Sequence, residues 1–108
     1  MIIDIHCHIR TPITEPRPLR RTLEIASRFG IQWLATSMGT TFRPTPTRDE
    51  IRRDNDHVLA LMREYPDRVV GYCYLNPHHG EFCLKELARC VEAGMRGIKL
   101  WVASLADD

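Results

Sequence analysis

Apolar residues along this chain form two kinds of pattern, short runs and longer stripes with helical spacing. Four short apolar runs predict β-strands over residues 1–8, 31–37, 68–75 and 95–102. Stripes with a period near 3.6 predict helices over residues 18–29, 47–65 and 81–93. The inward positions are Leu19, Leu23, Ala26 and either Phe29 or Gly30 in the first helix, Ile51, Asn55, Val58, Met62 and Tyr65 in the second, and Leu84, Leu87, Ala88 and Val91 in the third.

Turn residues and a capping motif mark the helix ends. Thr47 and Glu50 form a capping box, because the Thr47 side chain can accept from the Glu50 amide while the Glu50 side chain reaches back. Pro66 ends the second helix, and Gly30 and Gly94 suit the ends of the other two. The predicted order is therefore strand, helix, strand, helix, strand, helix, strand.

This order indicates the fold class. Strands that are apolar on both faces and separated by helices favour an α/β fold with a parallel sheet and right-handed crossovers. The strands begin about 25 to 35 residues apart, close to the ~31 residues per unit of a (β/α)8 TIM barrel. Four strands and three helices make half of such a barrel. We expect one partial domain over residues 1–108, the N-terminal half of a barrel, with two apolar edge strands unpaired.

Composition and charge narrow the functional classes. The chain has 108 residues, 44% hydrophobic and 27% charged, as in ordinary soluble domains. A net charge of +1, with Arg scattered among Asp and Glu, gives no basic face, so we expect neither nucleic-acid nor membrane partners. No apolar stretch approaches the ~20 residues that span a bilayer, and the start does not resemble a signal peptide, which predicts a cytoplasmic protein.

The cysteines carry no metal or redox motif. There is no Cys-x-x-Cys pair, which argues against a structural zinc knuckle and against a thioredoxin-like centre. Because all four lie in predicted strands or in the third helix, we expect reduced thiols that pack as small buried hydrophobes. These residues are Cys7, Cys73, Cys83 and Cys90.

The most informative polar residues are His6 and His8, which end the first strand. Side chains alternate along a strand, so both imidazoles share one face with Asp4, while Ile3 and Ile5 face the other way. Their backbones lie roughly 6.6 Å apart, which lets two neutral imidazoles converge on one cation. Carboxyl ends of strands are also where α/β proteins place ligands. We therefore predict a metal site, with a structural histidine pair as the alternative.

Three segments, taken in order, resemble one protein family. They are Ile-Asp-Ile-His-Cys-His at residues 3–8, Tyr-Pro-Asp-Arg-Val-Val-Gly at 65–71 leading to Leu-Asn-Pro at 75–77, and Gly-Met-Arg-Gly-Ile-Lys-Leu at 94–100. Over essentially the whole chain they are similar to the amidohydrolase superfamily, in its amidohydrolase-related branch of metal-dependent hydrolases. The resemblance implies a (β/α)8 barrel in which one or two divalent metals, most commonly zinc, activate water to attack an amide, ester or related bond of a small-molecule substrate.

The resemblance also implies roles for single residues. His6 and His8 match the family's first-strand metal ligands, and Lys99 matches a fourth-strand lysine that some members carbamylate to bridge two metals. Alternation puts Lys99 inside the barrel, where the other interpretation is a lysine that reaches the rim or pairs with a carboxylate such as Asp4. Trp101 stands where relatives often carry histidine, and we expect it to wall a pocket or to pack.

Other polar residues near the predicted rim are candidates for substrate contact. Arg10 follows the histidine pair and could hold a carboxylate substrate bidentately, although an ordinary exposed arginine is the alternative. His78, beside His79, follows the third strand and shares the rim. We expect His57 to face solvent and Asn55 to hydrogen-bond a neighbouring loop.

The family's site needs more than these residues. It includes a histidine after the fifth strand and an aspartate proton shuttle after the eighth, and Asp107 and Asp108 do not match the latter. A catalytic zinc usually has three protein ligands and a water. The catalytic residue is therefore unknown. We expect the 108-residue chain to be catalytically incomplete, as a truncated product, a fragment or a half-barrel that needs a partner.

Alternatives stay open at this point. TatD-like metal-dependent nucleases and polymerase-and-histidinol-phosphatase type phosphoesterases also begin with a strand ending in His-x-His. The latter carry a Ser-Asp-Gly-like turn that residues 9–12 lack, and a nuclease favours more basic charge. A decarboxylase of the same branch uses a similar metal site. A non-catalytic half-barrel binding or assembly module is also consistent, and two copies could close the open edges as a homo-oligomer.

Overall fold

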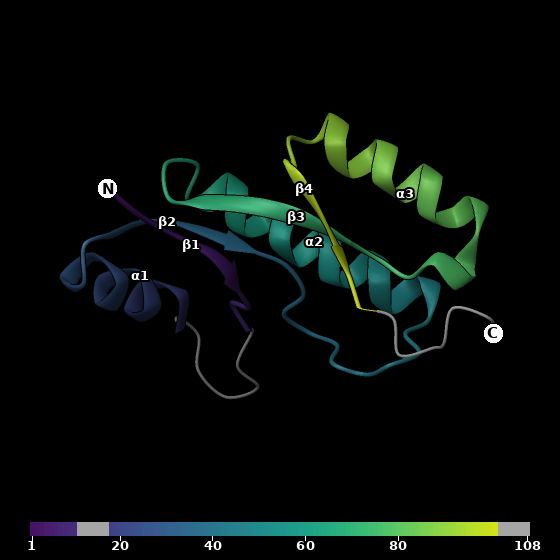
Figure 1. The fold of residues 1–108 in the computed structure, drawn as a ribbon, viewed down its shortest axis with the longest axis horizontal. Coiled ribbons are helices and arrows are strands. Elements are labelled where there is room, and N and C mark those ends of the chain that lie inside the picture. Colours follow the sequence, from purple (N-terminus) through teal and green to yellow (C-terminus); the bar gives the residue numbers. More distant parts are fainter. Residues whose placement is uncertain (11–17, 102–108) are drawn as a thin grey trace.

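A computed structural model of the chain describes residues 1–10 and 18–101, in which four strands alternate with three helices (Figure 1). The elements in order are β1 (Ile2–Cys7), α1 (Pro18–Arg28), β2 (Ile31–Thr36), α2 (Arg48–Glu64), β3 (Val69–Leu75), a 3₁₀ turn η1 (Pro77–His79), α3 (Glu81–Glu92) and β4 (Gly97–Leu100). The predicted order is confirmed. The Leu19 side chain, Val102 at the end of the predicted fourth strand, Asp107 and Asp108 lie outside what the structure describes.

All four strands are parallel and stand in sequence order in the sheet, β1-β2-β3-β4. Parallel neighbours need crossover connections, and each of the three helices provides one. Figure 1 shows the sheet strongly twisted, with β4 crossing steeply over the direction of β3. Four parallel strands joined by three helices in this order form half of a (β/α)8 barrel, as the strand spacing predicts.

Two apolar clusters fill the layer between the sheet and the helices. The first joins β2 and β3 to α1 and α2 through Leu23, Ala26, Leu34, Leu61 and Val69, and the second joins β3 to α2 and α3 through Val58, Leu59, Cys73, Leu75, Cys83, Cys90 and Met95. The strand register places Trp33, Ala35, Val70, Tyr72, Gly97 and Lys99 on the other side of the sheet, which we call the open face. In a closed barrel this face lines the interior.

The capping motif predicted for the second helix is present. The Glu50 amide donates to Thr47 Oγ1 at 3.2 Å, and the Thr47 amide donates to Glu50 Oε2 at 2.7 Å. This reciprocal pair satisfies two backbone donors that the helix itself leaves unpaired, so it defines the start of α2.

The face of α3 that packs inward differs from the prediction. Its buried residues are Cys83, Glu86 and Cys90, while Leu84 is 69% exposed and Val91 56% exposed. The inward stripe is therefore shifted by one position. The reason is Glu86, whose buried carboxylate accepts from Asn55 of α2 and so fixes the rotation of α3. Phe29, predicted to pack inward from the first helix, is also exposed.

The cysteines are free thiols, as predicted. Cys73, Cys83 and Cys90 are buried, and Cys7 is partly buried against the first cluster. Burial raises the pKa of the Cys7 thiol to about 11, which keeps it protonated and unreactive near neutral pH. Among the described residues, no helix is long and apolar enough to cross a membrane.

Candidate metal centre at the carboxyl ends of the strands

A β-bulge in β1 includes His6 and ends just before His8. Asp4 pairs with Leu34 and Cys7 pairs with Thr36, so four residues of β1 face three of β2. The strict alternation predicted for this strand is therefore wrong. Ile5 is 69% exposed rather than packed under helices, and Asp4 Oδ1 accepts from the His6 amide at 3.0 Å within the bulge. Bulges of this kind re-aim side chains beside functional sites.

His8 is held by the backbone of the neighbouring strand's end. Its Nδ1 lies 2.6 Å from the Ser37 carbonyl oxygen, and because a carbonyl only accepts, Nδ1 must carry the proton. The Nε2 lone pair of His8 is then available. Phe42 packs edge-on against the His8 ring at a centroid distance of 5.3 Å, which further limits how the ring can turn.

His6 has the same tautomer for a different reason. Its Nε2 lies 3.0 Å from the Lys99 ammonium nitrogen, which can only donate, so His6 Nε2 accepts and Nδ1 carries the proton. The rings of His6 and His8 stand edge-to-face, 5.2 Å apart. Metal-binding histidines typically coordinate through one nitrogen while the other donates to a carbonyl, which is the arrangement of His8.

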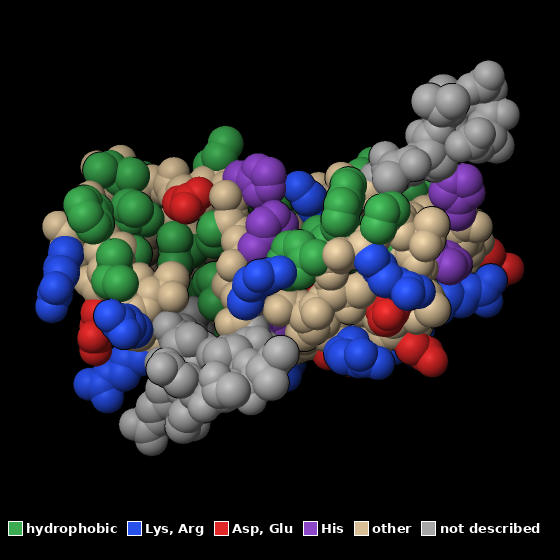
Figure 2. All heavy atoms as spheres, turned by 90° about the horizontal axis from the view of Figure 1, so that it is seen from below, with side chains coloured by type: hydrophobic (Ala, Val, Ile, Leu, Met, Phe, Trp, Pro, Cys, Tyr) green, Lys and Arg blue, Asp and Glu red, His purple; other side chains and the backbone are tan. Residues whose placement is uncertain are grey.

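Lys99 of β4 contacts His6 of β1, although these two strands are at opposite edges of the sheet. Lys99 pairs in register with Tyr74 and lies on the open face, so the twist of the sheet brings β4 across toward β1. The structure thus brings together all three residues predicted as metal ligands. Figure 2 shows histidine side chains gathered beside apolar ones near the middle of this side of the molecule.

These residues fit part of a zinc-type site. Two imidazoles and one amine converge, while the described residues contain no group of three or more His, Cys, Asp or Glu able to hold a metal ion. A catalytic zinc usually takes three protein ligands. The donor chemistry therefore suits a divalent metal, with at least one ligand still to be supplied, by Lys99 or by another residue.

Two residues predicted to contact substrate, Arg10 and Trp101, have different surroundings in the structure. The Arg10 guanidinium stacks over Phe42, 4.2 Å from the ring centroid, so Phe42 links Arg10 to His8. No sequence pattern singles out Phe42. Trp101 is half-buried and packs against the cluster of Met38, Ile51 and Tyr74, consistent with the expectation that it packs.

The other histidines are placed by the η1 turn and by α2. His78 is exposed in η1, where its amide donates to Asn76 Oδ1 at 3.1 Å, and His79 Nε2 donates to the Pro46 carbonyl at 2.7 Å. The prediction that His57 faces solvent is wrong. Its ring is half-buried and its Nε2 donates to the Ile9 carbonyl at 2.7 Å, because α2 lies close to the end of β1.

Asn55 bonds a strand rather than a loop. Its Nδ2 donates to the Tyr74 carbonyl at 3.1 Å, and its Oδ1 accepts from the Tyr74 amide at 2.7 Å. Pairing between β2 and β3 ends at Thr36 and Gly71, so Asn55 takes the place of a neighbouring strand at the end of β3. Its role is structural, as expected.

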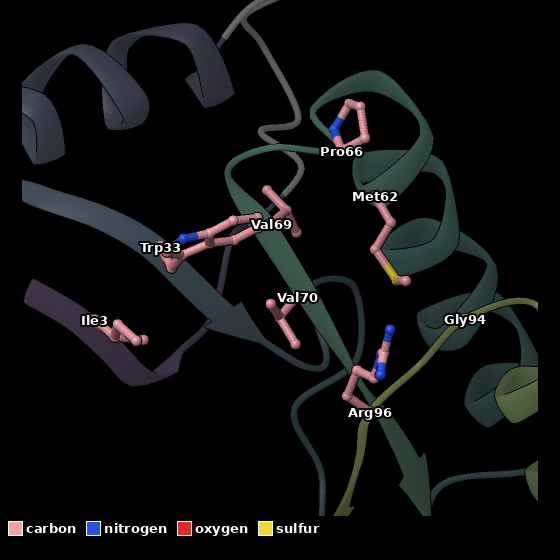
Figure 3. Close-up of a pocket in the computed structure, with 8 residues that line it drawn as sticks. All are labelled: Ile3, Trp33, Met62, Pro66, Val69, Val70, Gly94 and Arg96. Atoms are coloured by element: carbon pink, nitrogen blue, oxygen red, sulfur yellow. The ribbon is translucent and has the colours of Figure 1, made fainter. Parts of the chain in front are cut away.

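A pocket of about 560 Å³ lies at the opposite ends of the strands. Its lining comes from the first half of the strands, the loops before them and helix α2, as Figure 3 shows, and consists of Ile3, Trp33, Met62, Pro66, Val69, Val70, Gly94 and Arg96. Arg96 is the one charged residue in this lining. Barrel enzymes place their chemistry at the carboxyl ends, so this pocket is separate from the candidate metal centre.

Solved structures with the same fold include 2,6-dihydroxybenzoate decarboxylase from Rhizobium, with a TM-score of 0.69 and 20% identity over 90% of this chain and 37% of that chain. The decarboxylase complexed with 2,6-dihydroxybenzoate gives a TM-score of 0.70 and 20% identity, over 90% and 38% of the two chains. An amidohydrolase II gives 0.65 and 17%, over 92% and 39%. Identities this low show the fold alone, and this chain spans less than two-fifths of each of these proteins.

No curated protein sequence matches the chain. The family model described as amidohydrolase matches residues 3–108, nearly the whole sequence, and includes the histidine pair and Lys99. The chain belongs to the amidohydrolase family.

Proposed function

We propose that this chain supplies the first-strand and fourth-strand part of a metal-dependent hydrolase site of the amidohydrolase type, acting on a small-molecule substrate. One observation carries the proposal. The Nε2 lone pair of His8 is available for coordination because its Nδ1 is fixed by the Ser37 carbonyl. The His6 ring lies 5.2 Å away, and its Nε2 lone pair accepts from Lys99, a hydrogen bond that a bound metal would replace. A structural histidine pair would have no need of this arrangement.

A divalent ion held by His6 and His8, zinc in the first instance, would supply a water of lowered pKa and would polarise the scissile carbonyl. The protein's own residues hold the ion and orient the substrate. His6 and His8 would bind the ion through Nε2. Lys99 either donates to His6 or would offer a carbamate oxygen as a third ligand, formed when its ammonium loses one proton, adds carbon dioxide through the amine nitrogen and loses a second proton to solvent. Arg10, stacked on Phe42 beside His8, is placed to bind a substrate carboxylate.

Non-oxidative decarboxylation of an aromatic acid is the second candidate. Two of the solved structures with this fold are 2,6-dihydroxybenzoate decarboxylase, one of them with 2,6-dihydroxybenzoate bound. Arg10 would serve a carboxylate substrate in either reaction. Substrate panels distinguish the two, because a decarboxylase releases carbon dioxide from an aromatic acid, while a hydrolase produces a new carboxylic acid from an amide or ester.

We also propose that these 108 residues do not turn over substrate by themselves. The described part brings together two imidazoles and one amine. Only the two imidazoles are ready metal ligands, whereas a catalytic zinc normally has three protein ligands. The outer strands support a need for further strands, because Ile5 of β1 and both Ile98 and Leu100 of β4 are more than half exposed. Further strands of a longer polypeptide, or a second copy of this chain, would cover them.

Zinc binding tests the proposal directly. We expect the purified chain to bind about one zinc ion per chain in competition with a chromogenic chelator. We expect the double variant His6→Ala, His8→Ala to lose this binding. The double variant His78→Ala, His79→Ala is the matched control, because it removes the same number of imidazoles from the η1 turn. Equal zinc binding by all three proteins would contradict the proposal and favour a non-catalytic module.

A further inference from the structure

Helix α2 presents three polar side chains to the rim that carries the histidines. Asp54 and Asn55 are fully buried and His57 is half-buried, although each lies on a helix that otherwise packs through apolar residues. Figure 1 shows that α2 begins near the carboxyl ends of the strands, where the segment after β2 arrives. Each of the three side chains bonds the backbone of a different rim element.

Asp54 hydrogen-bonds to the backbone of the segment that follows β2. Its Oδ1 accepts from the Gly39 amide and the Thr40 amide at 2.8 Å each, and from Thr40 Oγ1 at 2.9 Å. The Thr41 amide adds a longer bond of 3.3 Å. This segment begins just after Ser37, whose carbonyl holds His8, and it leads to Phe42, which packs on the His8 ring.

The other oxygen of Asp54 shows that this carboxylate is kept at a cost. Asp54 Oδ2 is buried and has no hydrogen-bond partner among the described residues, and the same is true of Tyr74 Oη. Burial, followed by the charge of Asp54, raises the pKa of Tyr74 to about 12. A buried polar oxygen without a hydrogen bond is destabilising, so its retention fits a requirement for the bonds that Oδ1 makes.

His57 fixes the segment that follows β1. Its Nε2 donates to the carbonyl of Ile9, the residue directly after His8, while the Ile9 amide donates to Thr36 Oγ1 at 3.2 Å. The His57 ring packs directly on Gly39, where a Cβ atom would collide with it. Through His57 and Asp54, one helix therefore restrains the chain on both sides of the His8 hydrogen bond to Ser37.

We propose that Asp54 and His57 are positioning residues that orient His8 for metal binding. The proposal rests on the proposed function, because it assigns them to the same site. Both residues act by fixing the backbone that places His8 and Ser37. Outer partners of metal-binding histidines typically change metal affinity about 10- to 100-fold when they are removed.

The variants are chosen in matched pairs. Asp54→Ala and His57→Leu remove the bonds, whereas Asp54→Asn keeps an acceptor oxygen and His57→Gln keeps a donor nitrogen. Asp56→Ala is the control on the same helix, because that aspartate is exposed and pairs with Arg89 at 2.8 Å, away from the rim. Circular dichroism and urea unfolding establish which variants are folded.

Two measurements are made on each folded variant. The first needs no metal: long-range ¹H–¹⁵N spectra of the histidine rings report which nitrogen of His8 carries the proton. We expect the Nδ1–H tautomer in the unchanged chain and in Asp56→Ala, and a mixture in Asp54→Ala and His57→Leu. The second is the dissociation constant for Co²⁺, which we expect to rise about 10-fold or more in the same two variants and to recover in the conservative ones.

The outcomes separate the two proposals. If the unchanged chain binds no Co²⁺, the proposed function fails, while the His8 tautomer still tests the positioning role. If Asp54→Ala and His57→Leu are folded and leave both the tautomer and the Co²⁺ affinity unchanged, the positioning role is overturned. If Asp54→Ala does not fold, His57→Leu against His57→Gln decides in the same way.

Discussion

Polar side chains on the two sides of the sheet are arranged for different purposes. In the layer under the helices, Glu86 accepts from Asn55 at 3.0 Å and from Arg89 at 2.6 Å, so its charge is paired inside the protein. On the open face, His8 is fixed through Nδ1 and its Nε2 lone pair is left available. Both sides contain buried or half-buried polar groups, and our proposed metal ligands lie at the open face.

The comparison shows why burial of a polar residue is a poor indicator of function by itself. Glu86 is the most buried acid of α3 and its partners account for it completely, whereas His6 is exposed and carries the proposed chemistry. What distinguishes His8, one of the proposed ligands, is an available Nε2 lone pair on a ring that its neighbours hold in place. If this distinction is right, substitutions on the two sides affect different measurable quantities.

The largest expected effect is on the helix side. Glu86→Ala leaves the Arg89 and Asn55 groups without their buried partner, so we expect the free energy of unfolding to fall by about 3–5 kcal/mol, measured by urea denaturation. Glu81→Ala is the control on the same helix, since its pair with Lys85 is exposed and is worth less than about 1 kcal/mol. Loss of zinc affinity in a folded Glu86→Ala chain would break the proposed separation.

Acid provides a second test of the same residue. Burial alone would raise the pKa of Glu86, but hydrogen bonds from Arg89 and Asn55 outweigh it and lower the pKa below its usual 4.5. A lowered folded pKa stabilises the protein above the unfolded value, and this stabilisation is lost as pH falls through the folded value. In the unchanged chain, we expect the urea concentration at the unfolding midpoint to decrease as the pH is lowered below about 4.5. We expect a smaller decrease in Glu86→Gln. An equal dependence of the midpoint on pH in both proteins would contradict the pairing of Glu86 with Arg89 and Asn55.

A pair of glycine substitutions compares the sides directly. A Cβ at Gly71 of β3 would collide with Met62 and Val58, and a Cβ at Gly39 would collide with His57 and the Ile9 carbonyl. We expect each alanine variant to lose about 1–3 kcal/mol of stability from overpacking. Only Gly39→Ala should also weaken zinc binding, measured by chelator competition, because it displaces the rim. Equal zinc affinities in the two variants would contradict this.

The smallest expected effect concerns Lys99. Its side chain is partly exposed on the open face, so Lys99→Met should change folding stability by no more than about 0.5 kcal/mol. If Lys99 becomes a carbamate ligand, added bicarbonate raises the zinc affinity of the unchanged chain and has no effect on Lys99→Met. The same response to bicarbonate in both proteins would limit Lys99 to its hydrogen bond with His6.

The elements and their order follow from local patterns, which is why the sequence predicts them well. Apolar runs, helical stripes and the Thr47 capping box each depend on residues close together in the chain. The inward face of α3 could not be predicted in this way. Its rotation depends on a buried contact between Glu86 and Asn55, which are far apart in sequence, and the pattern favoured the exposed residues Leu84 and Val91 instead.

For the candidate site, the sequence predicts which residues take part but not how their side chains are oriented. His6, His8 and Lys99 are recognisable from spacing and from the family resemblance, and the structure places them together. Their orientation is not predictable, because it depends on the bulge in β1 and on a carbonyl of the segment after β2. Asp54 and His57 give no sequence signal, since their partners are backbone atoms of loops whose positions the pattern does not determine.

The central claim is that His6 and His8 bind a metal through Nε2. It is tested most directly by recording the ¹⁵N spectra of the five histidine rings during a zinc titration. We predict that the Nε2 resonances of His6 and His8 move together at about one equivalent, while those of His57, His78 and His79 stay in place. Zinc binding with no change at His6 and His8, or no binding at all, would contradict the account.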